Sequence, residues 1–266
     1  MQCWHITMTS TTRLPLFADE AARREAVRHL VRVVGGRLVL FSFADEHGHL
    51  VVVIEEDELG QIKTTIVRSM GPLVASPIAP LHVRPVEHRG HLTRLVGYFL
   101  GQTTHHELPE HPARWSGSCF PDLVGARCID GPPLRIRELL PQLRPASILA
   151  QVGLPADMAA GASDRALRVA GASRIVCAAS AATAARPDLS GRSDPVCAAR
   201  RAAVALADQV GIARSETSWA LDLTPGAVRR IAARPVDERA LRAARIQIAI
   251  EDFCAQSRIV PPAGTR

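Results

Sequence analysis

The stretch RLVLFSFADEHGHLVVVIE, residues 37–55, decides the fold. Residues 37–43 are almost all apolar and predict a buried strand, and residues 47–55, rich in β-branched valine, predict a second one. The short polar segment 44–46 between them is typical of a turn. Two adjacent strands joined so closely form an antiparallel hairpin. This hairpin is part of a predicted sheet.

The sequence on both sides of the hairpin alternates between strand and helix patterns. The predicted elements are strands at 2–9, 37–43, 47–55 and 78–86, and helices at 19–34, 58–70 and 90–104. Pro80 and Pro85 should keep the fourth strand short or at an edge of the sheet. The order βαββαβ plus one helix is that of a ferredoxin-like domain, so the predicted fold class is α+β.

Composition divides the chain into two unlike halves. The length of 266 residues fits one large domain or two smaller ones. Because 47% of the residues are apolar and 22% are charged, the chain can form a packed core. Residues 1–140 carry 15 basic and 15 acidic side chains, whereas residues 141–266 carry the whole formal net charge of +6. A basic second half fits a polyanionic partner.

Some classes of protein are not expected from this sequence. It has no apolar run of about 18 residues, so no membrane span is expected. The first residues lack the basic and then apolar run of a signal peptide. The six cysteines include no C-x-x-C pair, which argues against a zinc ribbon and a disulfide framework. We expect reduced thiols and a cytoplasmic location.

The hairpin carries a pair of histidines, His47 and His49, at alternate positions of its second strand. Alternate residues of a strand lie on the same face, so the two imidazoles could bind one divalent cation. The alternative is a pair of polar residues on a solvated strand face.

The helix predicted at 90–104 carries Tyr98, the only tyrosine, four residues before Gln102. Residues four apart share a helix face, so the Gln102 amide oxygen could be a third metal ligand beside the phenol. The alternative for Tyr98 is an amphipathic position with a packed ring and a wet hydroxyl. A phenol has an ordinary pKa of about 10, and a nearby cation favours the phenolate that attacks a phosphodiester. The product of that attack is a phosphotyrosine.

Four stretches in this order resemble the single-tyrosine HUH transposases, most closely the REP-associated tyrosine transposases of bacteria. They are Trp4-His5-Ile6-Thr7, His47-Gly48-His49-Leu50, Arg84-Pro85-Val86-Glu87 and Trp115-Ser116-Gly117-Ser118. The resemblance covers about residues 3–127. One departure is Gly48, because the family usually has a bulky apolar residue between its two histidines.

The resemblance implies a function and a site. The expected reaction is cleavage of single-stranded DNA, with Tyr98 joined to a 5′ phosphate and a 3′ hydroxyl released. His47 and His49 would hold Mg²⁺ or Mn²⁺, with Gln102 completing the metal site as in the insertion-sequence branch. Transposition of a hairpin-like element would follow from cutting and rejoining.

Further histidines crowd the same half of the chain, namely His82, His88, His91, His105, His106 and His111. They could contact DNA phosphates or simply be solvated, and a second metal site is a further alternative. None of them is assigned a role from the sequence.

A second motif lies in the basic half. Residues 215–221 predict a short helix, and Thr224 and Pro225 suit the N-cap and first position of another. The second helix carries Arg229, Arg230 and Arg234, as a helix-turn-helix would on the helix that enters the DNA major groove. The alternative is an ordinary helical hairpin with a solvated basic face. The segment also resembles the C-terminal DNA-binding module of bacterial replication initiators.

Together these patterns predict an HUH catalytic domain at 1–130, a helical or linker region at 131–195 and a helix-turn-helix module at 196–258. Whether residues 150–196 form a linker or small-residue helices stays open. The predicted function is a metal-dependent transposase acting on single-stranded or hairpin DNA, with duplex DNA bound by the C-terminal module. The alternatives are a catalytically inactive DNA-binding regulator and a phosphate- or metal-binding enzyme unrelated to DNA. The oligomeric state stays open.

Overall fold

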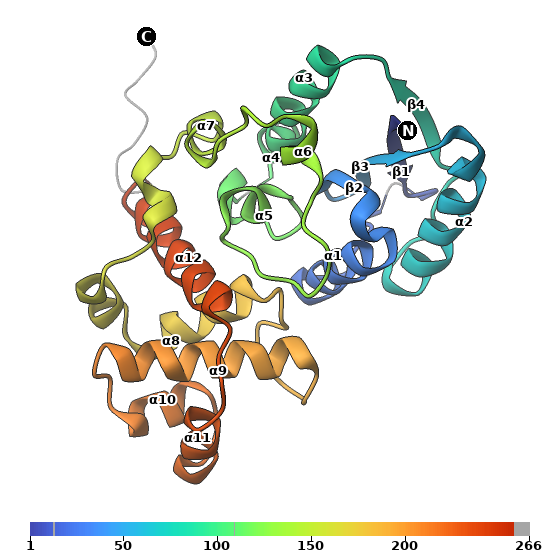
Figure 1. Cartoon of the computed structure of the whole chain (residues 1–266). Coiled ribbons are helices and arrows are strands. Elements are labelled where there is room, and N and C mark those ends of the chain that lie inside the picture. Colours follow the sequence, from blue (N-terminus) through green and yellow to red (C-terminus); the bar gives the residue numbers. More distant parts are fainter. Residues whose placement is uncertain (13, 109, 258–266) are drawn as a thin grey trace.

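A computed structural model describes residues 1–12, 14–108 and 110–257, and it is mixed α+β (Figure 1). The strands are β1 (Gln2–Thr9), β2 (Leu38–Phe43), β3 (His47–Ile54) and β4 (His82–Val86). They form one antiparallel sheet in the order β2-β3-β1-β4. The predicted hairpin is therefore confirmed as β2–β3, and the proline-containing strand β4 does lie at an edge.

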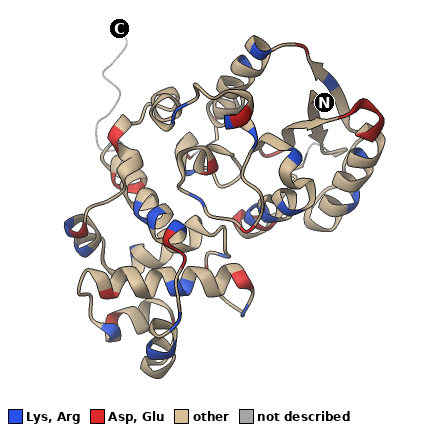
Figure 2. Cartoon of the chain, viewed as in Figure 1, with Lys and Arg blue, Asp and Glu red and all other residues tan. Residues whose placement is uncertain are grey.

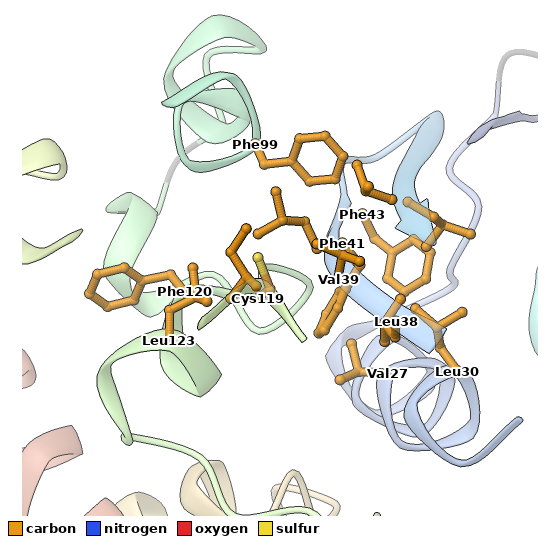
Figure 3. Close-up of a cluster of buried hydrophobic side chains, with 14 of the residues drawn as sticks. Val27, Leu30, Leu38, Val39, Phe41, Phe43, Phe99, Cys119, Phe120 and Leu123 are labelled. Carbon is orange, nitrogen blue, oxygen red and sulfur yellow. The ribbon is translucent and has the colours of Figure 1, made fainter. Parts of the chain in front are cut away.

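Helices cover both faces of this sheet. The helices α1 (Glu20–Val34) and α2 (Leu59–Met70) pack together on one face, and α3 (Arg89–Leu100) crosses the other (Figure 1). Val27 and Leu30 of α1 lie on one side of β2, and Phe99 of α3 lies on the opposite side (Figure 3). All three side chains are at most 1% exposed, so burial of apolar surface fixes α3 against the sheet.

Short elements follow the sheet. They are α4 (Gln102–His105), α5 (Phe120–Val124), α6 (Ile136–Leu139) and α7 (Pro145–Gln151), with single 3₁₀ turns at Gly35–Arg37, Glu56–Glu58, Gly71–Leu73, Pro112–Arg114 and Ala156–Ala160. The Trp115 indole N–H donates to the Phe43 carbonyl at 2.5 Å, and the Arg23 guanidinium lies 3.8 Å over the indole ring. These contacts tie the Trp115 turn to the end of β2, directly before the histidine pair.

The second half of the chain is helical. Its elements are α8 (Asp164–Ala182), α9 (Asp194–Gln209), α10 (Arg214–Ala220), α11 (Pro225–Ala232) and α12 (Glu238–Ser257). The open question over residues 150–196 is answered by α8, whose alanines are buried in a second core that begins at Ala162. Small side chains let α8 and α9 approach closely, so this region is packed rather than a loose linker. Residue 258, the predicted end of the module, lies outside the described residues.

The helix α12 joins the two parts of the molecule (Figure 1). Ile246, Ile250 and Cys254, spaced four apart, belong to the core of the sheet part. Ala240, Ala244 and Ile248 on another face of the helix belong to the second core.

Arginines of α1 add polar links between the two parts. Arg24 donates to the Ser180 hydroxyl at 2.8 Å and to the Ala185 carbonyl at 3.0 Å, and Arg28 donates to the Ala184 carbonyl. The two parts therefore keep separate cores, which α12 and these hydrogen bonds join.

The cysteines and the helix lengths bear on two sequence expectations. The six cysteines form no disulfide within the described residues, and burial raises the pKa of the Cys119 thiol to about 12. No helix in the described part of the chain is both long and apolar enough to cross a membrane.

Candidate active site on the sheet face beneath α3

The two histidines of β3 lie on the sheet face that α3 crosses. His47 pairs with Thr9 of β1 and His49 pairs with Thr7, so these four residues form two neighbouring cross-strand pairs. The imidazole centroids of His47 and His49 are 4.8 Å apart. The strand period thus brings both rings to one place, as the sequence predicted.

Tyr98 reaches the same place from α3. Its hydroxyl lies 3.1 Å from Nε2 of His49. The next residue, Phe99, is 1% exposed and anchors the helix, whereas Tyr98 is 43% exposed. The phenol therefore contacts a buried histidine on one side and is open to solvent on the other, which allows a large substrate to reach it.

Gln102 begins α4, two residues after Leu100, the last residue of α3, and Gly101 between them is the C-cap of α3. Its amide N–H donates to the Tyr98 carbonyl at 3.2 Å, and its Oε1 lies 3.2 Å from Nε2 of His47. The first contact fixes the amide so that its oxygen faces His47. The structure thus brings together all four residues selected in the sheet part: Tyr98, His47, His49 and Gln102.

His5 on β1 is a member of this cluster that the sequence analysis did not select. Its Nε2 lies 3.2 Å from Nδ1 of His49, and its ring centroid is 6.3 Å from that of Tyr98. Thr7 Oγ1 approaches the same His49 Nδ1 at 3.3 Å. The sequence does hold a signal for His5, because this residue lies on the first strand. In a βαββαβ order the first strand is the neighbour of the strand that carries His47 and His49.

These contacts define one set of hydrogen positions, assigned from the network. The Tyr98 hydroxyl donates to Nε2 of His49, so Nδ1 of His49 carries its hydrogen and donates to Nε2 of His5. Burial, and then the nearby charge of His47, lower the pKa of His49 to about 3. Burial, and then the charge of His91, lower the pKa of His5 to about 4. Both rings are therefore neutral at pH 7, the form that binds metal ions.

The donor atoms can be compared with the needs of a divalent cation. In the described residues no group of three or more His, Cys, Asp or Glu side chains is arranged to hold a metal ion. The set here is instead two imidazoles and an amide oxygen. The 3.2 Å between His47 Nε2 and Gln102 Oε1 is close to the about 3.0 Å between adjacent ligands of an octahedral ion bound at about 2.1 Å.

A neighbouring hydroxyl adds to this polar site. Ser42 Oγ, opposite His49 on β2, is buried and has no hydrogen-bond partner among the described residues. The two imidazoles and the amide oxygen would fit a Mg²⁺ or Mn²⁺ ion.

Gly48, the departure from the family pattern, has a structural reason. A Cβ atom at this position would lie 2.6 Å from Cδ1 of Phe43 and 3.3 Å from Cε of Met8. The Phe43 ring thus occupies the space of a bulky residue on the face opposite to the histidines. The change in sequence leaves the histidine face unaltered.

His106 is the nearest of the other histidines to His47, with ring centroids 4.4 Å apart. Burial, and then the charge of His47, lower its pKa. His88 has a local role, because its Nδ1 accepts from the His91 N–H and caps α3.

The three selected arginines of the helical half lie far from this cluster. The helix α10, the turn at 221–224 and α11 follow one another, and the Thr224 hydroxyl accepts from the Ala227 N–H at 3.2 Å as an N-cap. Arg229, Arg230 and Arg234 are exposed and have no ion pair within the described residues. Figure 1 shows α11 at the opposite end of the molecule from α3.

Comparison with protein-family models, curated proteins and solved structures found no match to this chain.

Proposed function

We propose that this protein is a metal-dependent single-strand DNA endonuclease and strand transferase of the HUH type. The observation that carries the proposal is the 3.1 Å contact between the only tyrosine hydroxyl and Nε2 of His49. The strand order β2-β3-β1-β4 supports it, because a ferredoxin-like βαββαβ domain has this order. In such a domain two helices cover one sheet face, and here the third helix brings the tyrosine to the other.

The reaction joins Tyr98 to DNA and releases a hydroxyl. The phenolic oxygen attacks the phosphorus of a phosphodiester, and the bond from phosphorus to the 3′ oxygen breaks. The phenol gives up its proton, and the leaving 3′ oxygen takes one up. Attack of a 3′ hydroxyl on the phosphotyrosine reverses the step and rejoins a strand.

Each residue of the cluster has a part in this reaction. His47, His49 and Gln102 would hold a Mg²⁺ or Mn²⁺ ion, which neutralises charge on the phosphate oxygens when bound. Without the ion, His49 Nε2 accepts from the Tyr98 hydroxyl, and this lone pair would pass to the ion on binding. His5 is a positioning residue that fixes the tautomer of His49. The exposed side of Tyr98 admits the strand.

We also propose that α10 and α11 form a helix-turn-helix that binds duplex DNA. The support is the Thr224 cap, the short turn and three exposed arginines without an ion pair in the described residues. Arg229 and Arg230 lie on α11, whereas Arg234, expected on the same helix, lies just after its end at Ala232. Packing of α9, α10 and α11 against one another gives the three-helix arrangement that such modules use.

The test is formation of a covalent protein–DNA adduct. The chain with Mn²⁺ is mixed with a pool of labelled hairpin oligonucleotides that carry randomised single-stranded flanks. We expect a labelled protein band on a denaturing gel, abolished by chelator and by Tyr98→Phe. Because the chain has a single tyrosine, no second phenol can replace Tyr98.

The same assay separates the main alternative, a catalytically inactive DNA-binding regulator. That protein would bind the oligonucleotides and give no adduct with any divalent cation. An adduct of equal yield from Tyr98→Phe would also contradict the proposed nuclease.

A further inference from the structure

Basic side chains gather beside Tyr98 from two elements, the edge strand β4 and the helix α3. On β4, His82 pairs with Thr7 and Arg84 pairs with His5. Residues that pair across an antiparallel ladder share a sheet face, so His82 and Arg84 lie on the face of the histidine cluster. Both are exposed.

On α3, His91, Arg94 and Tyr98 are spaced three and four residues apart, which puts them in one row along the helix. Arg94 and Tyr98 are exposed. A Cβ atom on Gly97, next to Tyr98, would meet nothing within 4 Å, so the surface beside the phenol is open. Figure 2 shows basic positions on both β4 and α3.

The two arginines are free to take an external anion. Neither Arg84 nor Arg94 has an ion pair with any carboxylate in the described part of the chain, and Glu87 at the turn between β4 and α3 pairs with neither. Burial is the main cause of the lowered pKa of His5, and the charges of His91, Arg84 and His82 lower it further. Such a strip of uncompensated positive charge attracts phosphates.

We propose that this strip, made of His82, Arg84, His91 and Arg94, binds the phosphates of the single strand that flanks the phosphate attacked by Tyr98. The inference rests on the proposed function for the identity of the strand. The guanidinium groups of Arg84 and Arg94 match phosphate in shape and charge, and the imidazoles can donate further hydrogen bonds. The strip therefore extends the site from one phosphate to a short track along β4 and α3.

The test compares variants in a Tyr98→Phe background, where binding is measured without covalent capture. Arg84→Gln with Arg94→Gln is compared with the matched pair Lys63→Gln and Arg68→Gln on α2, which covers the other sheet face. Binding of a fluorescent single-stranded oligonucleotide is followed by anisotropy over a range of salt. The strip pair should weaken binding roughly tenfold at low salt and reduce the slope of log affinity against log salt by about 1.4, for two phosphate contacts.

A charge-preserving variant shows whether weaker binding comes from the lost positive charge or from misfolding. Arg84→Lys with Arg94→Lys should keep the salt slope of the parent, and the control pair on α2 should leave affinity and slope near the parent values. If the glutamine pair and the control pair have the same single-strand affinity and the same salt slope, the strip does not bind phosphates and the proposal is wrong. An equal loss of duplex and single-strand binding by the glutamine pair would also overturn it, because duplex DNA is assigned to α11.

Failure of this inference and failure of the proposed function give different results. If the chain with Tyr98 forms the adduct but the glutamine pair binds like its control, the strip is wrong and the nuclease stands. If the glutamine pair loses single-strand affinity while the chain with Tyr98 never forms an adduct, the strip stands as a nucleic-acid surface without the nuclease.

Discussion

At the scale of single residues, substitution of His5 tests how the cluster around His49 is organised. Nε2 of His5 accepts the hydrogen of His49 Nδ1, so the lone pair of His49 is on Nε2, where a metal ion would take the place of the Tyr98 hydroxyl. His5→Phe keeps a ring of similar size but removes the acceptor. Loss of such a partner typically lowers metal affinity about 10- to 100-fold. Titration with Mn²⁺ followed by electron paramagnetic resonance would measure this change.

The matched variant for His5 is His5→Gln, whose side-chain oxygen can still accept a hydrogen bond. It should recover much of the Mn²⁺ affinity lost in His5→Phe. Equal affinity in all three proteins would mean that His5 only fills space beside Phe99.

Gly48 gives a second prediction at this scale, now of stability. In Gly48→Val the added side chain meets the Phe43 ring at 2.6 Å, so overpacking should cost about 1–3 kcal/mol of unfolding free energy. Phe43→Ala alone leaves a cavity and should cost about 3–5 kcal/mol.

The two changes at Gly48 and Phe43 should compensate each other, because valine would enter the space that the ring leaves. Urea denaturation of the double variant should therefore show a smaller loss than the two single losses added together. If the loss of unfolding free energy in the double variant equals the sum of the two single losses, valine does not fill the space that the ring leaves.

The sequence predicted the main members of the site because each depends on a short-range period. His47 and His49 follow the two-residue period of a strand, and Tyr98 and Gln102 follow the helical spacing of four. His5 could not be chosen in the same way. Which β1 residue lies beside His49 depends on the register between strands more than forty positions apart, and no local pattern encodes that register.

At the scale of elements, the alternating part of the chain was predictable and the alanine-rich part was not. The strands and helices of residues 2–100 have apolar periods and turn residues that mark their ends. The helix α8 is buried on several sides by small residues such as Ala172, Ala178 and Ala182, so it has no clear apolar stripe. Its position is decided by contacts with α9 and α12.

The contact between α8 and α12 predicts a dependence of stability on pH. Arg174 of α8 lies 3.4 Å from Glu251 and 2.7 Å from Asp252. Burial raises the pKa of Glu251 despite the nearby arginine. A carboxyl group whose pKa is higher in the folded state adds stability below its unfolded pKa, and this contribution is lost as pH rises through the folded pKa.

Glu251→Gln should therefore be more stable than the parent protein at neutral pH, by about 0.5 kcal/mol. The difference should vanish below about pH 4, where the unfolded carboxyl is also protonated. Urea midpoints across pH measure both effects. Asp252→Asn is the matched control and should not gain stability, because it loses the closer partner of Arg174. A less stable Glu251→Gln at neutral pH would mean that attraction to Arg174 outweighs the cost of burial.

At the scale of the whole molecule, α12 makes the two parts one body. Its residues enter both cores, and Gln247 on the same helix donates to the buried Ala126 carbonyl at 2.8 Å. The uneven charge of the sequence then has a spatial meaning. The neutral half contains the cluster around Tyr98, and the basic half presents its arginines on α11 at the other end (Figure 2). Two DNA contacts at a fixed separation are the arrangement that this shape favours.

This separation leads to a prediction that treats the two ends independently. Arg229→Gln with Arg230→Gln should weaken duplex binding and reduce the slope of log affinity against log salt by about 1.8, since each phosphate contact on B-DNA contributes about 0.9. Adduct formation on a short single-stranded oligonucleotide should stay at the parent rate, because that substrate does not reach α11. The pair Lys63→Gln and Arg68→Gln removes the same charge from α2 and should change neither measurement. If the arginine pair instead slows the adduct and leaves duplex binding unchanged, α11 is not the duplex contact and its basic face serves the catalytic end.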